Sequence, residues 1–407
     1  MKFLHAADIH LDSPLTGLQS RADLPETVLR HCTRRAFSAM IDLALAEDVA
    51  FLLIAGDLYD GDWKDFSTGL FFAAEMRRLG RPCFLLRGNH DAQSIITRNL
   101  PKPANVHEFS ARTCQTFEDR GIGVALHGHS FPNRAVPEDL SESYPAPRPG
   151  LLNIGLLHTS AEDPGEHETY APCRIGALRL KNYDYWALGH IHARQVLSEQ
   201  PWIVFPGNLQ GRHAKETGPK GCTLVTVEDR RVVAVEHRSV DVLRWAVLSV
   251  DATGTGLPQL SERIEAAVHQ ALIEADDRPL LARLTFTGAT ALHATLIEDT
   301  ERLAAECRAV ALNAGGELWV ESVKVRTRPA MQPEPELLAP LHAAFASGLD
   351  DPGQVAKLLA ELEALRRKLP VAAQADLDLP RDEDGLRQLA TDAWQVVAEL
   401  LAADEKP

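Results

Sequence analysis

The feature that most restricts the fold of this chain is a pattern repeated along its first 240 residues, in which a short apolar run ends in a cluster of polar residues. Buried strands of α/β proteins read as continuous apolar runs, and their carboxyl ends are where such proteins place ligands. Helical periodicity falls between the runs, as over Thr33–Glu47 and Leu70–Leu79. The pattern predicts an α/β layered domain over residues 1–240. The predicted strands are Lys2–Ala7, Val49–Ala55, Cys83–Leu86, Leu151–Leu157 and Tyr183–Leu188.

The pattern changes at about residue 241, where elements without a catalytic cluster of their own begin. Alternating strand patterns and helical faces follow one another there and predict a small α/β capping unit over residues 241–328, with the order β-α-β-α-β. A proline-rich linker over residues 328–336 ends this unit. The predicted elements are strand Trp245–Val250, a helix through Leu260 and Leu272, strand Leu280–Thr287, helix Leu292–Val310 and strand Leu318–Arg326.

Residues 337–407 are predicted to form a helical C-terminal region with two amphipathic helices. Asp351 and Pro352 stand at cap positions of the first helix, which carries an apolar stripe from Val355 to Leu365. The second helix carries its stripe from Leu386 to Leu400. Such stripes usually pack within their own chain, and binding of a partner protein is the alternative.

The polar residues at the ends of the predicted strands are the types that bind divalent cations. Oxygen and imidazole ligands suit Mn, Mg, Fe or Zn, and no thiolate is offered. Asp8 and His10 are two residues apart on an extended segment, so both side chains can reach one ion. A bend at His190 and His192 can send them to different ions, and the two oxygens of Asp57 can bridge. The candidate ligands are Asp8, His10, Asp57, Asn89, His158, His190 and His192.

Seven ligands with one of them shared make two four-ligand sites with open positions for water and phosphate, which predicts hydrolysis of phosphate esters. His90 follows Asn89 and can protonate the departing oxygen or stabilise the transition state. Asp60 can hold the His90 imidazole in position. Arg212 and His213 are candidate phosphate contacts in a polar loop, although a solvated loop fits them equally well.

Other polar residues near these motifs are interpreted as structural. His5 is expected to pack in its strand, Asp12 to cap the following turn, and Asp91 to form hydrogen bonds within its loop. His127 and His129 have the same spacing as His190 and His192, but no partner carboxylate is assigned to them. We therefore expect structural roles for both.

The motifs D-x-H, G-D-x-x-D, G-N-H-D, a strand-end histidine and G-H-x-H occur in this order over about the first 210 residues, and the chain thereby resembles the calcineurin-like metallophosphoesterases. The resemblance implies a four-layer α/β/β/α sandwich. It also implies that Asp57 is shared by two ions and that His90, with Asp60 behind it, is the catalytic imidazole. One ion would take Asp8, His10, Asp57 and His192, and the other Asp57, Asn89, His158 and His190.

Within that superfamily the chain resembles the SbcD-type DNA-repair nucleases, and most of all their YhaO-like bacterial branch, through residues 5–14, 206–213 and 216–222. This resemblance implies a DNA phosphodiester substrate, Mn²⁺ as the preferred ion, a partner ATPase with a long coiled coil, and dimerisation. Gly61 stands where protein phosphatases of the superfamily carry arginine, which counts against a phosphoprotein substrate. Asp60 stands where some repair nucleases carry histidine, which leaves the route of the proton open.

The charge and cysteine content restrict the setting of this chemistry. The formal charge of −15 argues against a general nucleic-acid coat protein, which would be basic, but does not exclude a nuclease. The six cysteines form no C-x-x-C unit, which argues against zinc-finger and thioredoxin folds and favours reduced thiols. No signal peptide or membrane-spanning run is recognisable. We therefore expect a cytoplasmic protein that does not contact membranes.

Two competing functions remain open from the sequence. A small-molecule phosphodiesterase or phosphatase would use the same metal site. A scaffold that binds DNA ends and an ATPase, with vestigial catalysis, is the second alternative, but a complete ligand set argues against it. Exonuclease or endonuclease preference, polarity, the physiological metal and the oligomeric state are not determined by the sequence.

Overall fold

The computed structural model describes the chain except for residues 16–17, 19–28, 30, 61–64, 93–101, 162–170, 331–337, 370–378 and 404–407. The chain divides into two compact units, which are described separately. The first comprises Met1–Val247, His269–Arg283 and Gly315–Glu321, and the second Leu248–Val268, Leu284–Ala314 and Ser322–Pro407. The three-part division at residues 240, 328 and 337 stays a prediction.

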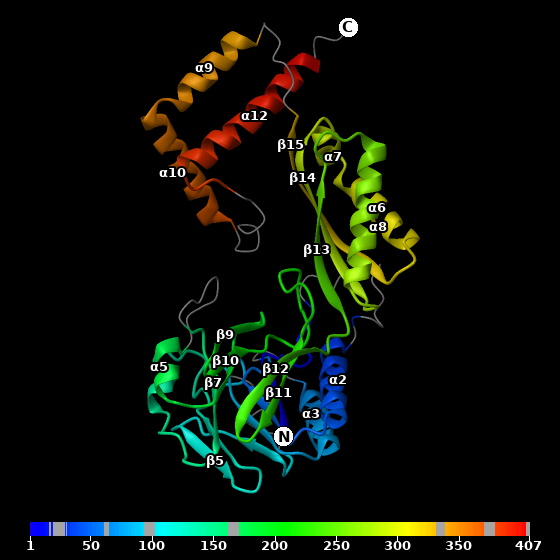
Figure 1. The fold of residues 1–407 in the computed structure, drawn as a ribbon. Helices are drawn as coiled ribbons and strands as arrows, with labels where there is room; N and C mark the ends of the chain where they lie inside the picture. Colours follow the sequence, from blue (N-terminus) through cyan, green and yellow to red (C-terminus); the bar gives the residue numbers. More distant parts are fainter. Residues whose placement is uncertain are drawn as a thin grey trace. The chain divides into compact units, whose positions relative to one another are not determined.

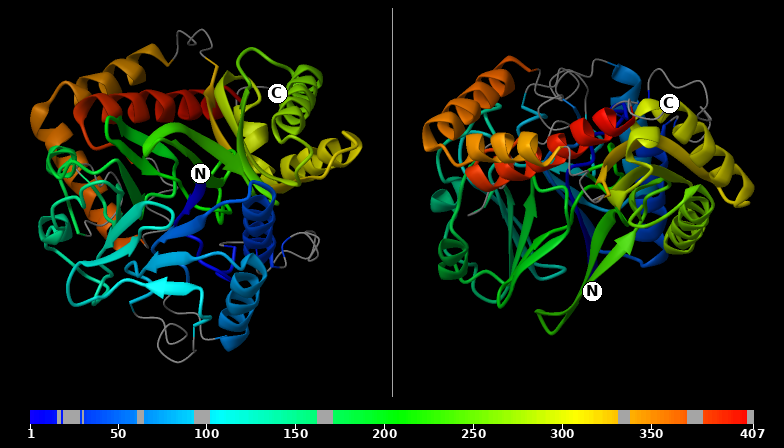
Figure 2. Two further views of the ribbon diagram at one scale, coloured as in Figure 1. Left: turned by 60° about the horizontal axis from the view of Figure 1, so that its bottom comes forward. Right: turned by 90° about the horizontal axis from the view of Figure 1, so that it is seen from above.

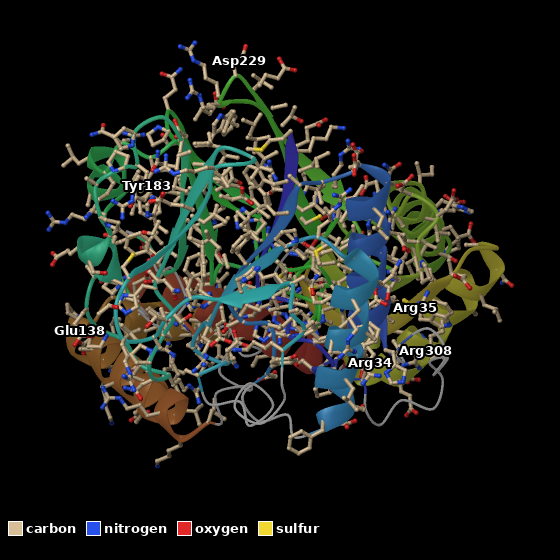
Figure 3. The ribbon with its side chains drawn as sticks, turned by 90° about the horizontal axis from the view of Figure 1, so that it is seen from below. Arg34, Arg35, Glu138, Tyr183, Asp229 and Arg308 are labelled. Carbon is tan, nitrogen blue, oxygen red and sulfur yellow. The ribbon has the colours of Figure 1, made fainter. Side chains whose placement is uncertain are left out.

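The first six-stranded sheet of the described residues has the order β12-β11-β1-β2-β3-β4. Its strands are β1 (Lys2–Ala6), β2 (Phe51–Ala55), β3 (Cys83–Leu86), β4 (Val106–Glu108), β11 (Gly221–Glu228) and β12 (Arg231–Ser239). Strands β1 to β4 are parallel, and β11 joins β1 antiparallel. The turn between β11 and β12 holds Asp229 and Arg230 at φ 46° and 61°, and Asp229 is labelled at its tip in Figure 3. Left-handed residues in this turn suit the twist of a hairpin.

The second six-stranded sheet has the order β5-β6-β7-β8-β10-β9. Its strands are β5 (Gln115–Asp119), β6 (Val124–Gly128), β7 (Leu152–His158), β8 (Tyr185–Gly189), β9 (Gln195–Glu199) and β10 (Trp202–Phe205). Strands β6, β7, β8 and β10 are parallel, and the two edge strands β5 and β9 are antiparallel to their neighbours.

The two sheets pack face to face through an apolar core, and helices cover their outer faces. Phe3 and Phe51 of the first sheet stack at 4.9 Å, and Phe3 meets Tyr185 of the second sheet edge-on at 5.5 Å. Helices α2 (Cys32–Ala46) and α3 (Phe66–Leu79) lie side by side and pack on the outer face of the first sheet (Figures 1 and 2). Helix α5 (Ile175–Leu180) and the 3-10 turn Leu140–Ser143 cover the second. This arrangement confirms the predicted four-layer α/β/β/α sandwich.

The parallel strands bring the predicted polar clusters to one edge of the sandwich. In the first sheet β1, β2 and β3 run parallel and adjacent, so their carboxyl ends meet. In the second sheet β7 pairs with β8, and His158 lies opposite Gly189. The shared edge of the two sheets therefore carries all five clusters, although they are as far apart as 182 residues in sequence.

The smaller sheet has the order β13-β14-β15, with β13 (Arg244–Asp251), β14 (Leu280–Thr290) and β15 (Leu318–Pro329). Its helices are α6 (Leu257–Glu274), α7 (His293–Glu298) and α8 (Thr300–Asn313). The predicted order of elements is right, but the single helix predicted over Leu292–Val310 is wrong. Asp299 separates α7 from α8, because its carboxylate accepts a hydrogen bond from the backbone N–H of Arg302 and caps the new helix.

Both predicted C-terminal helices are present as α10 and α12, but the described residues of this region form a third helix, α9, that was not predicted. The three helices are α9 (Ala339–Leu349), α10 (Pro352–Lys368) and α12 (Glu383–Ala403). Asp351 caps α10 and Pro352 occupies its first turn, as predicted. Helix α9 packs on α12 through His342 and Phe345, whose rings stack on Trp394 at 4.9 and 5.4 Å.

Most of the predicted linker lies outside the described residues. Across the described parts of the chain, no helix has both the length and the apolar character needed to cross a bilayer.

Candidate metal centre

The backbone turns sharply where the strands end, and this turn aims the candidate ligands. Asp8, His10 and Asp57 have left-handed backbone with φ of 51°, 44° and 52°, and His190 has φ 105°. Left-handed backbone costs roughly 1–2 kcal/mol for each non-glycine residue, and such strain gathers at functional sites. The Asp8 and His10 N–H groups donate to the carbonyl oxygens of Gly56 and Asp57 at 3.0 Å each, which holds the two strand ends in register.

The structure brings the predicted ligands together in one buried cluster. Ligand atoms of Asp8, Asp57 and His158 all lie within 4.8 Å of one another, and so do those of Asp8, His10 and His192. Asp57 Oδ2 lies 3.4 Å from His158 Nε2 and 3.9 Å from His10 Nε2. Asp57 therefore stands between the two groups, as a bridging ligand requires.

The remaining two candidates adjoin the same cluster. Asn89 Oδ1 lies 3.0 Å from His158 Nε2. The ring of His190 meets that of His158 at 5.2 Å, and the His190 N–H donates to both oxygens of Asp8 at 3.0 Å. Each of the seven candidates thus lies beside at least one other candidate, and their roles as ligands stay a prediction.

The chemistry of the cluster fits bound cations. Both ring nitrogens of His10 are buried and have no hydrogen-bond partner among the described residues. Burial lowers the pKa of His10 and raises the pKa of Asp8, although the charges of His192 and His158 oppose the Asp8 shift. Burial acts to raise the pKa of Asp57, but the charge and hydrogen bond of His158 outweigh it and hold that pKa well below its usual range. Unpaired imidazole nitrogens beside buried carboxylates form a donor set that divalent ions satisfy.

Two glycines make room for this cluster. A Cβ on Gly56 would lie 2.4 Å from His158 Nδ1, and a Cβ on Gly88 would lie 2.2 Å from Asp57 Oδ1. The glycines of the G-D and G-N-H-D motifs therefore permit the close approach of ligand side chains to neighbouring backbone. His158 is further fixed by donating from Nδ1 to the carbonyl oxygen of Ala55 at 2.9 Å, which leaves Nε2 directed at the cluster.

His90 and Asp60 form the predicted pair beside the cluster. The His90 ring nitrogen Nδ1 donates to Asp60 Oδ1 at 3.0 Å. The His90 backbone N–H donates to Asp57 Oδ1 at 2.9 Å. Burial acts to lower the pKa of His90, but the hydrogen bond to Asp60 and the charge of Asp57 outweigh it and raise that pKa. The hydrogen bond to His90 lowers the pKa of Asp60. Ligand atoms of His10, Asp60 and His90 also lie within 4.8 Å of one another, so metal content is an informative measurement on His90 variants.

The two candidate phosphate contacts differ in their surroundings. Arg212 Nη1 lies 3.2 Å from Ser13 Oγ and 3.7 Å from Asp60 Oδ2, which places its guanidinium beside the His90–Asp60 pair. His213 Nε2 lies 3.4 Å from Glu216 Oε1, and burial lowers the pKa of His213. The structure therefore places Arg212 at the edge of the site and directs His213 toward a carboxylate.

Sequence reasoning missed the role of Glu216, which was noted only as part of a resembling segment. This buried carboxylate accepts a hydrogen bond from His192 Nδ1 at 2.5 Å. Burial acts to raise the pKa of Glu216, but the hydrogen bond and charge of His192 and the charge of Arg212 hold it well below its usual range. No spacing rule links Glu216 to His192, because strands β9 and β10 lie between them and the chain brings the two side chains together only when it is folded.

The residues interpreted as structural lie outside the ligand groups, with one correction. His5 is buried between Tyr185 and Leu188, and Asp91 accepts backbone N–H bonds, among them one from Tyr59 at 2.9 Å. The predicted turn-capping role of Asp12 is wrong. Its carboxylate instead binds the guanidinium of Arg34 in a bidentate pair, and Arg34 (Figure 3) lies in the first turn of α2.

His127 lies in strand β6 of the second sheet, and His129 directly follows that strand. His127 Nδ1 lies 2.8 Å from Thr116 Oγ1, and its ring stacks on Tyr183 at 4.5 Å (Figure 3). His129 Nδ1 lies 3.3 Å from Ser143 Oγ. Neither histidine joins a group of ligand atoms within the described residues.

Comparison with known proteins identifies the family that this fold and site define. Residues 1–194 match the family model of the calcineurin-like phosphoesterases, and residues 245–328 match that of the middle domain of metallophosphoesterase YhaO. The chain therefore belongs to the calcineurin-like metallophosphoesterases, which are metal-dependent hydrolases of phosphate esters.

The most informative similarities are to one bacterial and two DNA-repair proteins. The chain is 35% identical over 299 residues to the uncharacterized metallophosphoesterase YhaO of Bacillus subtilis (strain 168), covering 71% of this chain and 72% of that protein. It is 25% identical over 268 residues to the DNA double-strand break repair protein Mre11 of Sulfurisphaera tokodaii, covering 61% of this chain and 65% of that protein. The Mre11 protein of Sulfolobus acidocaldarius is 23% identical over 304 residues, covering 69% and 74%.

Proposed function

We propose that this protein is a nuclease that hydrolyses DNA phosphodiester bonds with two bound divalent ions, preferably Mn²⁺. The observation that carries the proposal is the cluster of candidate ligands at one edge of the sandwich, in which ligand atoms of Asp8, Asp57 and His158, and likewise those of Asp8, His10 and His192, lie within 4.8 Å of one another. The similarity to two DNA double-strand break repair proteins supports DNA as the substrate class. When bound, the ions supply Lewis-acid activation of water and neutralise charge on the phosphate oxygens.

The protein's own side chains then have separate tasks. His90 donates a proton from Nε2 to the departing oxygen, since its Nδ1 is held by Asp60. Arg212 lies beside Asp60 and pairs with a phosphate oxygen of the substrate, while Ser13 fixes the Asp60 carboxylate with a hydrogen bond of 2.8 Å. The strained backbone at Asp8 and His10 holds these two metal-ligand side chains in position before the substrate arrives.

The test is cleavage of end-labelled single-stranded and duplex DNA by the purified protein with Mn²⁺, compared with cyclic nucleotides and a chromogenic diester. We expect DNA cleavage that falls by roughly 10²–10⁴-fold in His90→Ala, the usual contribution of general acid–base catalysis, while the bound metal remains. Asp57→Ala should lose both ions. His129→Asn removes a histidine outside the cluster and should leave cleavage and metal content unchanged.

Three results would contradict parts of this proposal. Full nuclease activity in His90→Ala would remove the catalytic role of His90. Turnover of small diesters without cleavage of DNA would favour the small-molecule alternative, which the formal charge of −15 also supports. Bound metal without hydrolysis of any diester would favour a scaffold that binds DNA ends.

We also propose that the helical C-terminal region binds a coiled-coil ATPase subunit and that the protein dimerises. Large apolar side chains of this region are exposed, which supports a protein partner. They include Leu341, Leu358, Leu365, Leu389 and Val397. Light scattering of the purified protein tests dimerisation, and a monomer at micromolar concentration would contradict it.

The six cysteines are free thiols, a state that reducing compartments favour, which supports our proposal of a cytoplasmic location. Fractionation of cells tests it.

A further inference from the structure

The Glu216 carboxylate connects a candidate metal ligand with the loop that carries Arg212. Its Oε1 accepts from His192 Nδ1 at 2.5 Å. Its Oε2 accepts from Asn208 Nδ2 at 3.0 Å and from the backbone N–H of Arg212 at 2.7 Å. Glu216 is buried, so these bonds are shielded from competing water. One side chain therefore ties the end of β8 to the segment that follows β10.

The direction of these hydrogen bonds determines the chemical form of His192. An ionised carboxylate only accepts hydrogen bonds, so the His192 nitrogen that faces Glu216 must carry the hydrogen. In a neutral imidazole this leaves the lone pair on Nε2. A metal ion binds a lone pair, so the Glu216 contact selects the tautomer and the ring orientation that bind metal through Nε2. Ligand atoms of His192, Asp8 and His10 lie within 4.8 Å of one another, which is where such an ion would sit.

We propose that Glu216 is a positioning residue of the metal centre, which sets the tautomer of His192 for metal binding and holds the Arg212 loop against the same site. The proposal rests on the proposed metal centre and adds to it a residue that does not itself touch metal or substrate. Its consequence is that metal affinity and the placement of Arg212 depend on one buried carboxylate.

The variant Glu216→Gln should change the tautomer of His192 while keeping the hydrogen bonds that hold the Arg212 loop. The glutamine oxygen should occupy the position of Oε2, because Asn208 and the Arg212 N–H both donate there. The amide NH₂ then faces His192 Nδ1 as a donor, which places the imidazole hydrogen on Nε2 and removes the ligating lone pair. In the opposite amide orientation the glutamine NH₂ would face two other hydrogen-bond donors, Asn208 Nδ2 and the backbone N–H of Arg212, and no acceptor.

The measurement is the affinity and stoichiometry of Mn²⁺ by calorimetry and electron paramagnetic resonance. We expect Glu216→Gln to bind Mn²⁺ roughly 10–100-fold more weakly, the usual effect of losing the partner of a metal-bound histidine. The melting temperature in chelator should change little. Asp241→Asn is the matched control, because Asp241 is an equally buried carboxylate that pairs with Arg244 and Arg278. It should lower stability and leave Mn²⁺ affinity unchanged.

A double-mutant comparison shows whether Glu216 acts through His192. In a His192→Ala background, Glu216→Gln should cause no further loss of Mn²⁺ affinity. An unchanged affinity in Glu216→Gln, an equal loss in Asp241→Asn, or an additive loss in the double variant would each overturn the inference. Wild-type protein that binds no Mn²⁺, Mg²⁺, Fe²⁺ or Zn²⁺ would instead overturn the proposed function, and the inference with it.

Discussion

Individual residues at the centre carry costs that only their function explains. Asp8, His10 and Asp57 adopt left-handed backbone, and Gly88 leaves no space for a Cβ next to Asp57. The residue types and their spacing could be read from the sequence, because the motifs are local. The strain could not, since it arises from strand ends held in register by hydrogen bonds to Gly56 and Asp57.

His5 gives a pH-dependent contribution to stability. Burial lowers the pKa of His5 to about 3, although the hydrogen bond to the Leu188 carbonyl opposes the shift. Below a pH of about 6.5 the His5 side chain therefore binds a proton in the unfolded chain but stays neutral in the folded chain. The free energy of unfolding falls as the pH drops from about 6.5 toward 3. Between pH 8 and pH 5 this loss is about 2 kcal/mol.

The variant His5→Gln tests this dependence, because glutamine can still donate to Leu188 and does not titrate. Urea unfolding in chelator at pH 8 and pH 5 should show a difference about 2 kcal/mol smaller than in wild type. His269→Gln, which removes an exposed histidine of α6, is the control and should keep the wild-type difference. An unchanged pH dependence in His5→Gln would show that His5 is not the group responsible.

Among the elements, the strands were predicted better than the helices. Buried parallel strands are continuous apolar runs, so β1, β2 and β3 were located within two residues of their observed bounds. Helix α9 was missed because its short, almost uniformly apolar sequence shows no clear face. The predicted helix over Leu292–Val310 was interrupted by a cap at Asp299, which periodicity does not register.

Helix α10 provides a test of the proposed partner. Leu358 and Leu365 are seven residues apart on α10, and each is at least 40% exposed. Replacing both with glutamate adds charge to an already solvated face, so folding and metal content should be unchanged. Binding to a coiled-coil ATPase subunit in a pull-down should fall at least tenfold, because two charges would have to be buried.

Lys357→Glu and Glu361→Lys, also on α10, exchange exposed charges without removing apolar surface and serve as the control. Equal binding by wild type and the Leu358→Glu, Leu365→Glu variant would show that this apolar face is not the interface.

For the whole first unit, the metal centre should link the two sheets. Asp57 follows a strand of the first sheet and His158 ends a strand of the second, so ions held by both would bind the folded state only. At a hundredfold excess over the dissociation constant, each bound ion contributes about 2.7 kcal/mol of stability. We therefore expect Mn²⁺ to raise the melting temperature above its value in EDTA by several degrees.

Asp57→Ala should abolish this rise, because the shared ligand is lost from both sites. Asp184→Ala, which removes a half-buried carboxylate just before the start of β8, should retain it. A rise of equal size in Asp57→Ala would place the stabilising ions elsewhere in the protein.

Local sequence patterns were sufficient to identify the layered fold, the seven candidate ligands and the His90–Asp60 pair, because apolar runs, turn residues and two-residue spacings act over a few positions. Folding in three dimensions decided which distant groups meet. Glu216 reaches His192, Arg212 reaches Asp60, and Asp12 pairs with Arg34 of α2 instead of capping its own turn. These contacts depend on how loops return between parallel strands of two sheets, and no local pattern encodes the path of a loop.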